Sequence, residues 1–321
     1  MKSLVRSVVA VALFIGIAAL LVRQPSFGAL PFIATSHADP ARLRQHVLFL
    51  ADEVAPRDIQ HPDNLERAAS YIADALTAAG GRLESQPFTA RGARYRNLSA
   101  RFGLEGLDRI VVGAHYDAFG DFGANPGADD NASGVAGLLE LARILGKQAV
   151  PRPIELVAFS TEEPPCFASQ PMGSAVHARN LRQTGTRVQA MLCLEMIGYY
   201  TPRQAWPSLL FRLVYPSSGE FVAVVGRWQD RALARRVKSA MQGAGGVDVY
   251  SYSGPSIPGI DASDHRNYWA NGFAAVLVTD TAFLRNPNYH APGDRPETLD
   301  YERMARVVDG VANAVLQPAG R

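Results

Sequence analysis

The stretch RIVVGAHYD at residues 109–117 decides the fold class, because an unbroken apolar run passes here directly into polar side chains. A run of this kind, without polar alternation, is typical of a central strand that is buried on both faces of a sheet. The segments around it alternate between strand-like and helix-like patterns. We therefore predict an α/β fold with a single domain, in which helices cover both faces of a central, mostly parallel or mixed β-sheet.

The same patterns predict the remaining elements. Helices are expected where apolar residues recur at helical spacing, at residues 37–50, 64–79, 132–145, 174–183, 229–244 and 297–316. Strands are expected at residues 82–90, 95–101, 109–115, 154–159, 188–194, 221–225 and 274–279. Two segments rich in Pro, Ser, Gly and Tyr, at 199–219 and 250–262, are predicted to be loops over the strand ends that contact a ligand.

The composition narrows the class of protein. The chain has 321 residues, of which 47% are hydrophobic and 19% are charged, so a sizeable core is expected. A net charge of +2 without a Lys/Arg block predicts no nucleic-acid partner. The two cysteines, Cys166 and Cys193, are too few for a disulfide scaffold or a thiolate zinc site. Both adjoin candidate ligand residues, which leaves a disulfide between them as a hypothesis.

The N-terminus predicts export. Lys2 and Arg6 precede an uncharged apolar run at residues 8–22. At 1.5 Å per residue the run spans about 22 Å, short of a hydrocarbon core of about 30 Å, which favours a signal peptide within residues 1–28. A retained membrane anchor through residues 8–22 stays an equal alternative, and a buried core helix is a third. Residues 29–321 would then function in the periplasm or outside the cell, or attached to the membrane.

Metal-binding residue types follow four of the predicted strands. The polar residues at these positions are His115 and Asp117, then Glu162 and Glu163, then Glu195, and finally His290 after a loop. In α/β sheets, ligands bind beyond the carboxyl ends of the strands. Imidazole and carboxylate without thiolate suit a catalytic zinc, or less often cobalt or manganese. So many carboxylates with two histidines favour two metals that share one carboxylate.

Each residue also has a purely structural interpretation. The pair Glu162–Glu163 could be a solvated loop, and Asp129–Asp130 could cap a helix. Glu195 is harder to explain, because an unpaired carboxylate in an apolar strand costs several kcal/mol. The purely structural interpretations would all have to be true at the same time, whereas one metal site accounts for all these residues. We therefore favour the metal site. Asp129 is then expected to shape its turn, and Asp121 to be a loop residue.

The chain resembles the M28 metallopeptidases, the co-catalytic dizinc aminopeptidases and their relatives. The resemblance covers about residues 40–318 and rests on seven stretches that occur in the family's order: His115–Asp117, Pro126–Gly134, Thr161–Glu163, Met172–Ser174, Leu194–Met196, Ser263–His265 and Tyr289–His290. It implies the zinc exopeptidase (phosphorylase/hydrolase-like) fold and two Zn²⁺ ions per chain. It also implies a cis peptide bond between Asp130 and Asn131.

The resemblance assigns roles to single residues. Asp130 would bridge the two metals. One metal would add His115 and Glu163, and the other would add Glu195, where many members have aspartate, and His290. Glu162 would be the general base.

Two further roles follow from the resemblance. Asp117 would orient His115, and Tyr289 would help to stabilise the oxyanion. The activity implied is that of an aminopeptidase, which uses water activated by two zinc ions to release residues from a peptide with a free N-terminus. A glutaminyl cyclase with one zinc and a non-catalytic peptide-binding relative are the alternatives. The segment 164–172 could wall a specificity pocket or be a plain surface loop.

Overall fold

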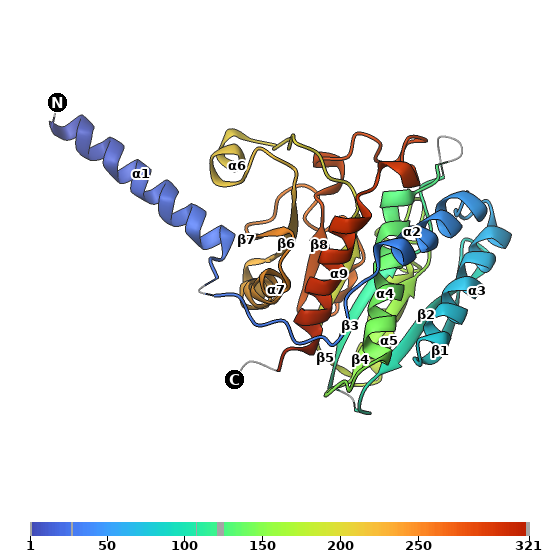
Figure 1. Cartoon of the computed structure of the whole chain (residues 1–321). Helices are drawn as coiled ribbons and strands as arrows, with labels where there is room; N and C mark the ends of the chain where they lie inside the picture. Colours follow the sequence, from blue (N-terminus) through green and yellow to red (C-terminus); the bar gives the residue numbers. More distant parts are fainter. Residues whose placement is uncertain (1, 27, 107, 121–124, 319–321) are drawn as a thin grey trace.

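The computed structural model describes residues 2–26, 28–106, 108–120 and 125–318. Its centre is an eight-stranded sheet with the strand order β1-β2-β4-β3-β5-β8-β6-β7 (Figure 1). The strands are β1 (Arg82–Ala90), β2 (Ala93–Phe102), β3 (Asp108–His115), β4 (Ile154–Phe159), β5 (Arg187–Glu195), β6 (Phe221–Arg227), β7 (Asp248–Gly254) and β8 (Ala275–Thr279). All seven predicted strands are present, and their bounds agree with the prediction to within two residues.

The direction of the strands determines where a site can form. β3 pairs in parallel with both β4 and β5, and β5 pairs in parallel with β8. β2 runs antiparallel to β1 and β4, and β6 runs antiparallel to β8 and parallel to β7. The sheet is therefore mixed, as predicted. Because its four central strands are parallel, their carboxyl ends lie at one edge.

Helices cover both faces of this sheet (Figure 1). The longer helices are α2 (Pro40–Leu48), α3 (Pro62–Ala78), α4 (Gly134–Gly146), α5 (Gly173–Gln183), α7 (Arg231–Ala244) and α9 (Tyr301–Leu316). Side chains of α2, α3, α4, α7 and α9 pack in one large core, to which β3 contributes Ile110, Val112 and Ala114. On the opposite face, β3 contributes Val111 to a smaller core with α5 and α8 (His265–Ala270). Because side chains on both faces of β3 are buried, its sequence is a continuous apolar run.

Several boundaries differ from the prediction for local reasons. Helix α9 begins at Tyr301 because the Asp300 side chain accepts a hydrogen bond from the Arg303 amide at 2.9 Å and caps it. Short helical turns precede or link the main elements, at Phe49–Glu53, Ala128–Ser133, Trp228–Asp230, Ala282–Leu284 and Pro296–Thr298.

The two segments predicted to be loops contain regular structure. Most of strand β7 lies in the second segment, and the six-residue helix α6 (Leu209–Val214) lies in the first. Helix α8 was also missed. Six residues are too few to show a helical period, and β7 alternates Tyr and Ser, which resembles a loop in composition. Strand β7 forms because β6 offers it an unpaired edge, which is a long-range cause.

The disulfide hypothesis is wrong. Cys166 and Cys193 are both free, buried thiols. Cys166 packs in the large core, whereas Cys193 packs in the smaller core on the opposite face of the sheet. The sulfur of Cys193 lies 3.3 Å from the Ser263 hydroxyl.

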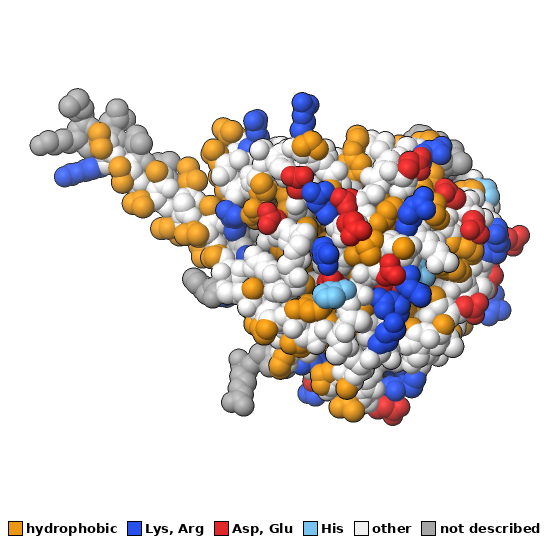
Figure 2. All heavy atoms as spheres, in the orientation of Figure 1, with side chains coloured by type: hydrophobic (Ala, Val, Ile, Leu, Met, Phe, Trp, Pro, Cys, Tyr) orange, Lys and Arg blue, Asp and Glu red, His pale blue; other side chains and the backbone are white. Residues whose placement is uncertain are grey.

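Helix α1 (Lys2–Arg23) projects from the domain as a single rod (Figure 1). Hydrophobic side chains lie along it in contact with solvent (Figure 2). The stretch Val5–Arg23 is long and apolar enough to cross a membrane, at about 28 Å for 19 residues. This stretch is longer than the apolar run at residues 8–22. The expectation that the N-terminal segment is too short to span a membrane is therefore weakened.

Candidate metal centre

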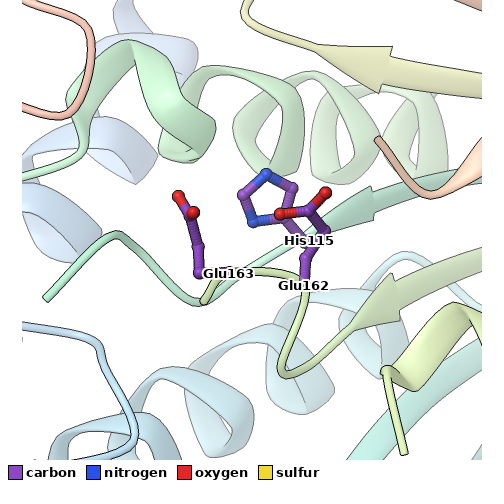
Figure 3. A group of neighbouring side chains, drawn as sticks. All are labelled: His115, Glu162 and Glu163. Carbon is purple, nitrogen blue, oxygen red and sulfur yellow. The ribbon is translucent and has the colours of Figure 1, made fainter. Parts of the chain in front are cut away.

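The predicted ligands meet at the carboxyl edge of the four parallel strands. His115 is the last residue of β3, and Glu195 is the last residue of β5. Glu162 and Glu163 follow β4, and their carboxylates extend toward the same space as the His115 ring (Figure 3). His290 lies on the loop after β8, and Asp130 lies on the turn before α4. Neighbouring strands thus bring together residues from distant parts of the sequence.

The two oxygens of Asp130 face two separate groups of ligands. Oδ1 lies 3.4 Å from Nε2 of His115, which is itself 3.2 Å from Oε2 of Glu195. Oδ2 lies 3.1 Å from Nε2 of His290, which is itself 3.4 Å from Oε2 of Glu163. Asp130 thus faces both groups. The grouping differs from the expected pairing, because His115 lies beside Glu195 and His290 lies beside Glu163.

These separations fit tetrahedral metal coordination. Ligand atoms about 2.0 Å from a zinc ion lie about 3.3 Å from one another along the edges of a tetrahedron. The four distances from imidazole to carboxylate are 3.1–3.4 Å. In addition, Oε1 of Glu163 is buried and accepts a hydrogen bond from none of the described residues. The donor set and the spacing therefore fit two cations, with Asp130 between them.

The charges point to the same conclusion. Burial and the nearby Asp130 raise the pKa of Glu163 to about 8. Burial likewise raises the pKa of Glu162 well above its usual value, with Glu163 adding to the effect. Burial opposes protonation of His290, but hydrogen bonds to Asp130 and Glu163 outweigh it and raise the imidazole pKa to about 10. Without cations, protons therefore neutralise these carboxylates. Bound cations would balance the same negative charge.

Backbone conformation at the site is unusual. Thr161, just before Glu162, has a φ of 58°, and Met196, just after Glu195, has a φ of 49°. His290 itself has a φ of 56°. Non-glycine residues seldom adopt positive φ, and those that do are concentrated at functional sites. Each of these residues turns the chain sharply where a candidate ligand must point into the cluster.

Asp117 contacts both His115 and the main chain of the two glutamates. Its carboxylate oxygens accept hydrogen bonds from the main-chain amides of Glu162 and Glu163, at 3.1 and 3.0 Å. The Nδ1 atom of His115 lies 3.1 Å from the main-chain carbonyl of Asp117 and 3.6 Å from its carboxylate. The His115 ring is therefore oriented mainly by the Asp117 main chain, while the Asp117 side chain fixes the two glutamates.

No sequence pattern pointed to Asp294, which holds the main chain at Asp130 in place. Its two carboxylate oxygens accept hydrogen bonds from the amides of Asp129 and Asp130, both at 2.9 Å. The Asp129 side chain points elsewhere and accepts hydrogen bonds from Gly198 and Asn286, which links three loops. The peptide bond between Asp130 and Asn131 is cis, as expected. Asp121 lies outside the described residues.

Arg57 is a second residue that the sequence analysis missed. Its guanidinium group is fully buried beneath the cluster. Burial lowers its pKa to about 10, against the opposing effect of Asp294 and other carboxylates, so it remains charged at neutral pH. It donates hydrogen bonds to the main-chain carbonyls of Leu50, Tyr116, Pro126 and Gly127. The fixed positive charge ties the loop before Asp130 to the turn Phe49–Glu53, which follows α2.

Two residues of the matching motifs support Glu195 and His290. Ser263 donates a hydrogen bond of 2.7 Å to Oε2 of Glu195. The ring of Tyr289 stacks on His290 with centroids 3.8 Å apart, and Phe119 stacks on His290 at 4.1 Å. Burial raises the pKa of Tyr289 well above its usual value, so its hydroxyl keeps its proton.

An apolar cavity of about 480 Å³ opens beside the cluster, and Glu195 and Tyr289 are among its walls. Most of the remaining lining comes from the two segments predicted to contact a ligand, 199–219 and 250–262. This part of the wall includes five aromatic residues: Trp206, Phe211, Tyr215, Tyr250 and Tyr252. Residues 164–172 are not among the residues that line it, which favours the surface-loop interpretation of that segment.

Solved structures with the same fold belong to zinc exopeptidases and related enzymes. A Zn-dependent exopeptidase from Parabacteroides distasonis ATCC 8503 aligns with a TM-score of 0.67 at 18% identity, over 89% of this chain and 100% of that chain. A glutaminyl cyclase from Bacteroides thetaiotaomicron aligns with a TM-score of 0.65 at 18% identity, over 91% of this chain and 100% of that chain. At this identity the likeness shows the fold alone.

Sequence relatives give the family. The protein YfbL of Escherichia coli (strain K12), described as uncharacterized, is 45% identical over 301 residues, or 91% of this chain and 92% of YfbL. Leucine aminopeptidase 1 of Trichophyton rubrum is 26% identical over 74% of this chain, which spans only 64% of that protein. The sequence profile of peptidase family M28 matches residues 97–315, which include the candidate ligands and most of the sheet. The chain therefore belongs to peptidase family M28, a family of enzymes that hydrolyse peptide bonds.

Proposed function

We propose that this protein is a metallo-aminopeptidase with two Zn²⁺ ions per chain. The observation that carries the proposal is Asp130, whose two oxygens face two separate pairs of a histidine and a glutamate. His115 and Glu195 would hold one ion, and His290 and Glu163 would hold the other. A carboxylate shared in this way is the usual means of keeping two metals close enough to act on one substrate.

The reaction we propose assigns proton transfer to Glu162. When bound, the metal ions supply Lewis acidity to the scissile carbonyl and to the attacking water. The Glu162 carboxylate takes a proton from that water and returns it to the amine of the leaving group. Its position beside His115 and Glu163 places it within reach of the same space. The Tyr289 hydroxyl, which keeps its proton, would donate a hydrogen bond to the oxyanion.

The cavity supports a preference for substrates with a large apolar N-terminal residue. Its volume of about 480 Å³ exceeds what a single side chain needs, and its walls are mainly aromatic and aliphatic. Because Glu195 and Tyr289 form one end, a substrate whose scissile bond lies at the metals can extend its first side chain into the cavity. Burial of that side chain would stabilise the bound substrate by about 1.5–3 kcal/mol.

Two alternatives remain distinct in their chemistry. A glutaminyl cyclase of this fold would use one zinc, and a binding protein would need no general base. The five candidate ligands lie on two sides of Asp130, which favours two metals over one. Metal analysis of active enzyme separates these alternatives, because one zinc per chain would contradict the present proposal.

The experiment that tests the activity is the variant Glu162→Gln in the full chain. We expect it to keep two zinc ions but to lose at least about a hundredfold in kcat on amino-acyl fluorogenic substrates. The variant Glu66→Gln, at an exposed glutamate on α3, serves as the control and should retain full activity. Unchanged hydrolysis by Glu162→Gln would rule out the proposed base.

We also propose that α1 is a retained membrane anchor and that the domain functions outside the cytoplasm. The end of α1 is bound to the domain, because the Lys238 amine and the Ser251 hydroxyl donate hydrogen bonds of 2.8 and 2.6 Å to the Arg23 carbonyl. The next residue, Gln24, is buried. Removal of α1 would break these contacts. Intact mass analysis of protein from membranes tests this proposal, since a mature chain that begins after residue 23 would contradict it.

A further inference from the structure

The helix α6 has an outer apolar face that the domain does not cover. Its residues Leu209, Leu210 and Leu213 are 69%, 51% and 70% exposed. The opposite side of the same helix carries Phe211, which lines the apolar cavity. A short helix that is apolar on both sides, in a soluble domain, marks a surface that contacts another apolar phase.

The position of α6 relative to α1 points to a lipid bilayer as this apolar phase. Val22 of α1 and Phe211 and Val214 of α6 pack on the same aromatic cluster, which includes Tyr215 and Tyr252. The Arg23 guanidinium lies over the rings of Tyr250 and Tyr215, at 5.2 and 5.8 Å from their centroids. The end of α1 and the helix α6 thus pack on one shared apolar cluster.

The two helices also face the same side of the molecule. In Figure 1, α6 lies at the end of the domain from which α1 projects. In Figure 2, hydrophobic side chains lie along α1 and also at this end of the domain. A bilayer that contains α1 would therefore reach α6.

The charge around α6 suits such a surface. The segment 196–219 contains Arg203 and Arg212, both exposed, and no Asp or Glu. Basic residues next to exposed leucines and to aromatic rings such as Trp206 are typical of segments that lie in the interface of an anionic bilayer.

We propose that α6 lies in the surface of the bilayer that α1 spans, with Leu209, Leu210 and Leu213 in contact with lipid. The inference rests on the proposal that α1 is a retained anchor. It goes beyond that proposal, because it gives the domain a second membrane contact and fixes its orientation. The wall of the cavity formed by Phe211 then adjoins the membrane, so the site is open to peptides that lie at the lipid surface.

Site-specific labelling of the full chain tests this contact. Cys166 and Cys193 are fully buried, so a thiol-reactive fluorophore will react at an introduced cysteine. Three single variants are needed: Leu213→Cys on α6, Phe14→Cys in the middle of α1, and Leu104→Cys as the control. Leu104 is 63% exposed and lies on the turn between β2 and β3, at the sheet edge opposite the carboxyl ends.

Each labelled chain is reconstituted into vesicles of phosphatidylcholine and phosphatidylglycerol. The lipids carry a nitroxide near the headgroup to probe positions 213 and 104, and near the end of the acyl chain to probe position 14. We expect the label at position 213 to lose most of its fluorescence and the label at position 104 to keep it. Quenching at position 14 but not at position 213 would overturn this inference and leave the anchor proposal intact. Absence of quenching at position 14 would overturn both.

The main alternative is that a second copy of the chain, and not lipid, covers this face of α6. Measurements on the labelled Leu213→Cys chain in detergent distinguish these two possibilities. If the label becomes inaccessible to a neutral aqueous quencher as protein concentration rises in detergent, a protein–protein contact covers α6 and the proposal is wrong. If accessibility is constant in detergent and falls only in vesicles, lipid covers it. Vesicles of phosphatidylcholine alone should give weaker quenching at position 213, because Arg203 and Arg212 then lose their anionic partners.

Discussion

The hydroxyl of Ser263 donates a hydrogen bond of 2.7 Å to Oε2 of Glu195, the oxygen that lies 3.2 Å from Nε2 of His115. Hydrogen bonds of this kind orient a metal ligand before the ion arrives. We therefore predict that Ser263→Ala lowers zinc affinity about 10- to 100-fold, as measured by competition with a chelator.

The control for this variant is Ser253→Ala. Ser253 is another fully buried serine, on β7, whose hydroxyl has no hydrogen-bond partner among the described residues. Removal of its hydroxyl should leave zinc affinity unchanged. Equal losses in the two variants would mean that Ser263 acts only through general stability.

The strands and the ligand types were predictable because they depend on local patterns. The run from Ile110 to Ala114 is apolar at every position because both faces of β3 are covered, and the same holds for β4. His115 and Glu195 stand out because each ends such a run. The segments 199–219 and 250–262, which supply most of the cavity wall, stood out by their composition, although α6 and β7 within them did not.

The pairing of the ligands could not be predicted, because it depends on which side of Asp130 each strand end approaches. Nothing in the order of His115, Glu163, Glu195 and His290 along the chain specifies this. Arg57 and Asp294 were missed for a similar reason. Each acts through main-chain groups of distant residues, which carry no side-chain signal in the sequence.

The pairing itself yields a prediction about metal content. The double variant Glu163→Ala/His290→Ala should lose one zinc per chain and keep the other, because both residues serve the same ion. The double variant Glu195→Ala/His290→Ala should lose both zinc ions. Elemental analysis after dialysis provides the measurement. Retention of one ion by His115→Ala/Glu163→Ala would instead support the pairing expected from the family resemblance.

A buried ion pair away from the site predicts how stability depends on pH. Glu155 on β4 lies 2.9 Å from Nη1 of Arg109 and 3.7 Å from Nε2 of His177. Burial opposes ionisation, but these partners outweigh it and lower the pKa of Glu155 from 4.5 to about 2. A depressed carboxylate pKa stabilises the fold above the unfolded value, and that stability is lost as pH falls from about 4.5 to about 2.

At neutral pH, the ionised Glu155 carboxylate is expected to contribute about 3 kcal/mol to the free energy of unfolding. Urea unfolding of Glu155→Gln should show this loss at pH 7 and a shallower dependence on pH below 4.5. The exposed pair of Glu84 and Arg101 provides a control, since Glu84→Gln should change the free energy of unfolding by less than about 1 kcal/mol. Parallel pH profiles for wild type and Glu155→Gln would contradict the assignment.

The apolar cavity predicts a change of substrate preference. Ala223 on β6 lines the cavity, and its side chain is almost fully covered. A larger residue there would take up space that we assign to the first side chain of the substrate. The variant Ala223→Leu should therefore lower kcat/KM for phenylalanyl and leucyl substrates about 10- to 100-fold, at about 1–3 kcal/mol of lost binding. The alanyl substrate needs less room, so its kcat/KM should change little.

Ala93→Leu, at a partly buried position on β2 away from the cavity, is the matched control for added volume. It should leave the ratio of phenylalanyl to alanyl kcat/KM at the wild-type value. The ratio is the decisive measurement, because a loss of folded enzyme lowers both rates equally, whereas a filled pocket lowers only one. If Ala223→Leu reduced the rates on all substrates by the same factor, the cavity would not hold the N-terminal side chain.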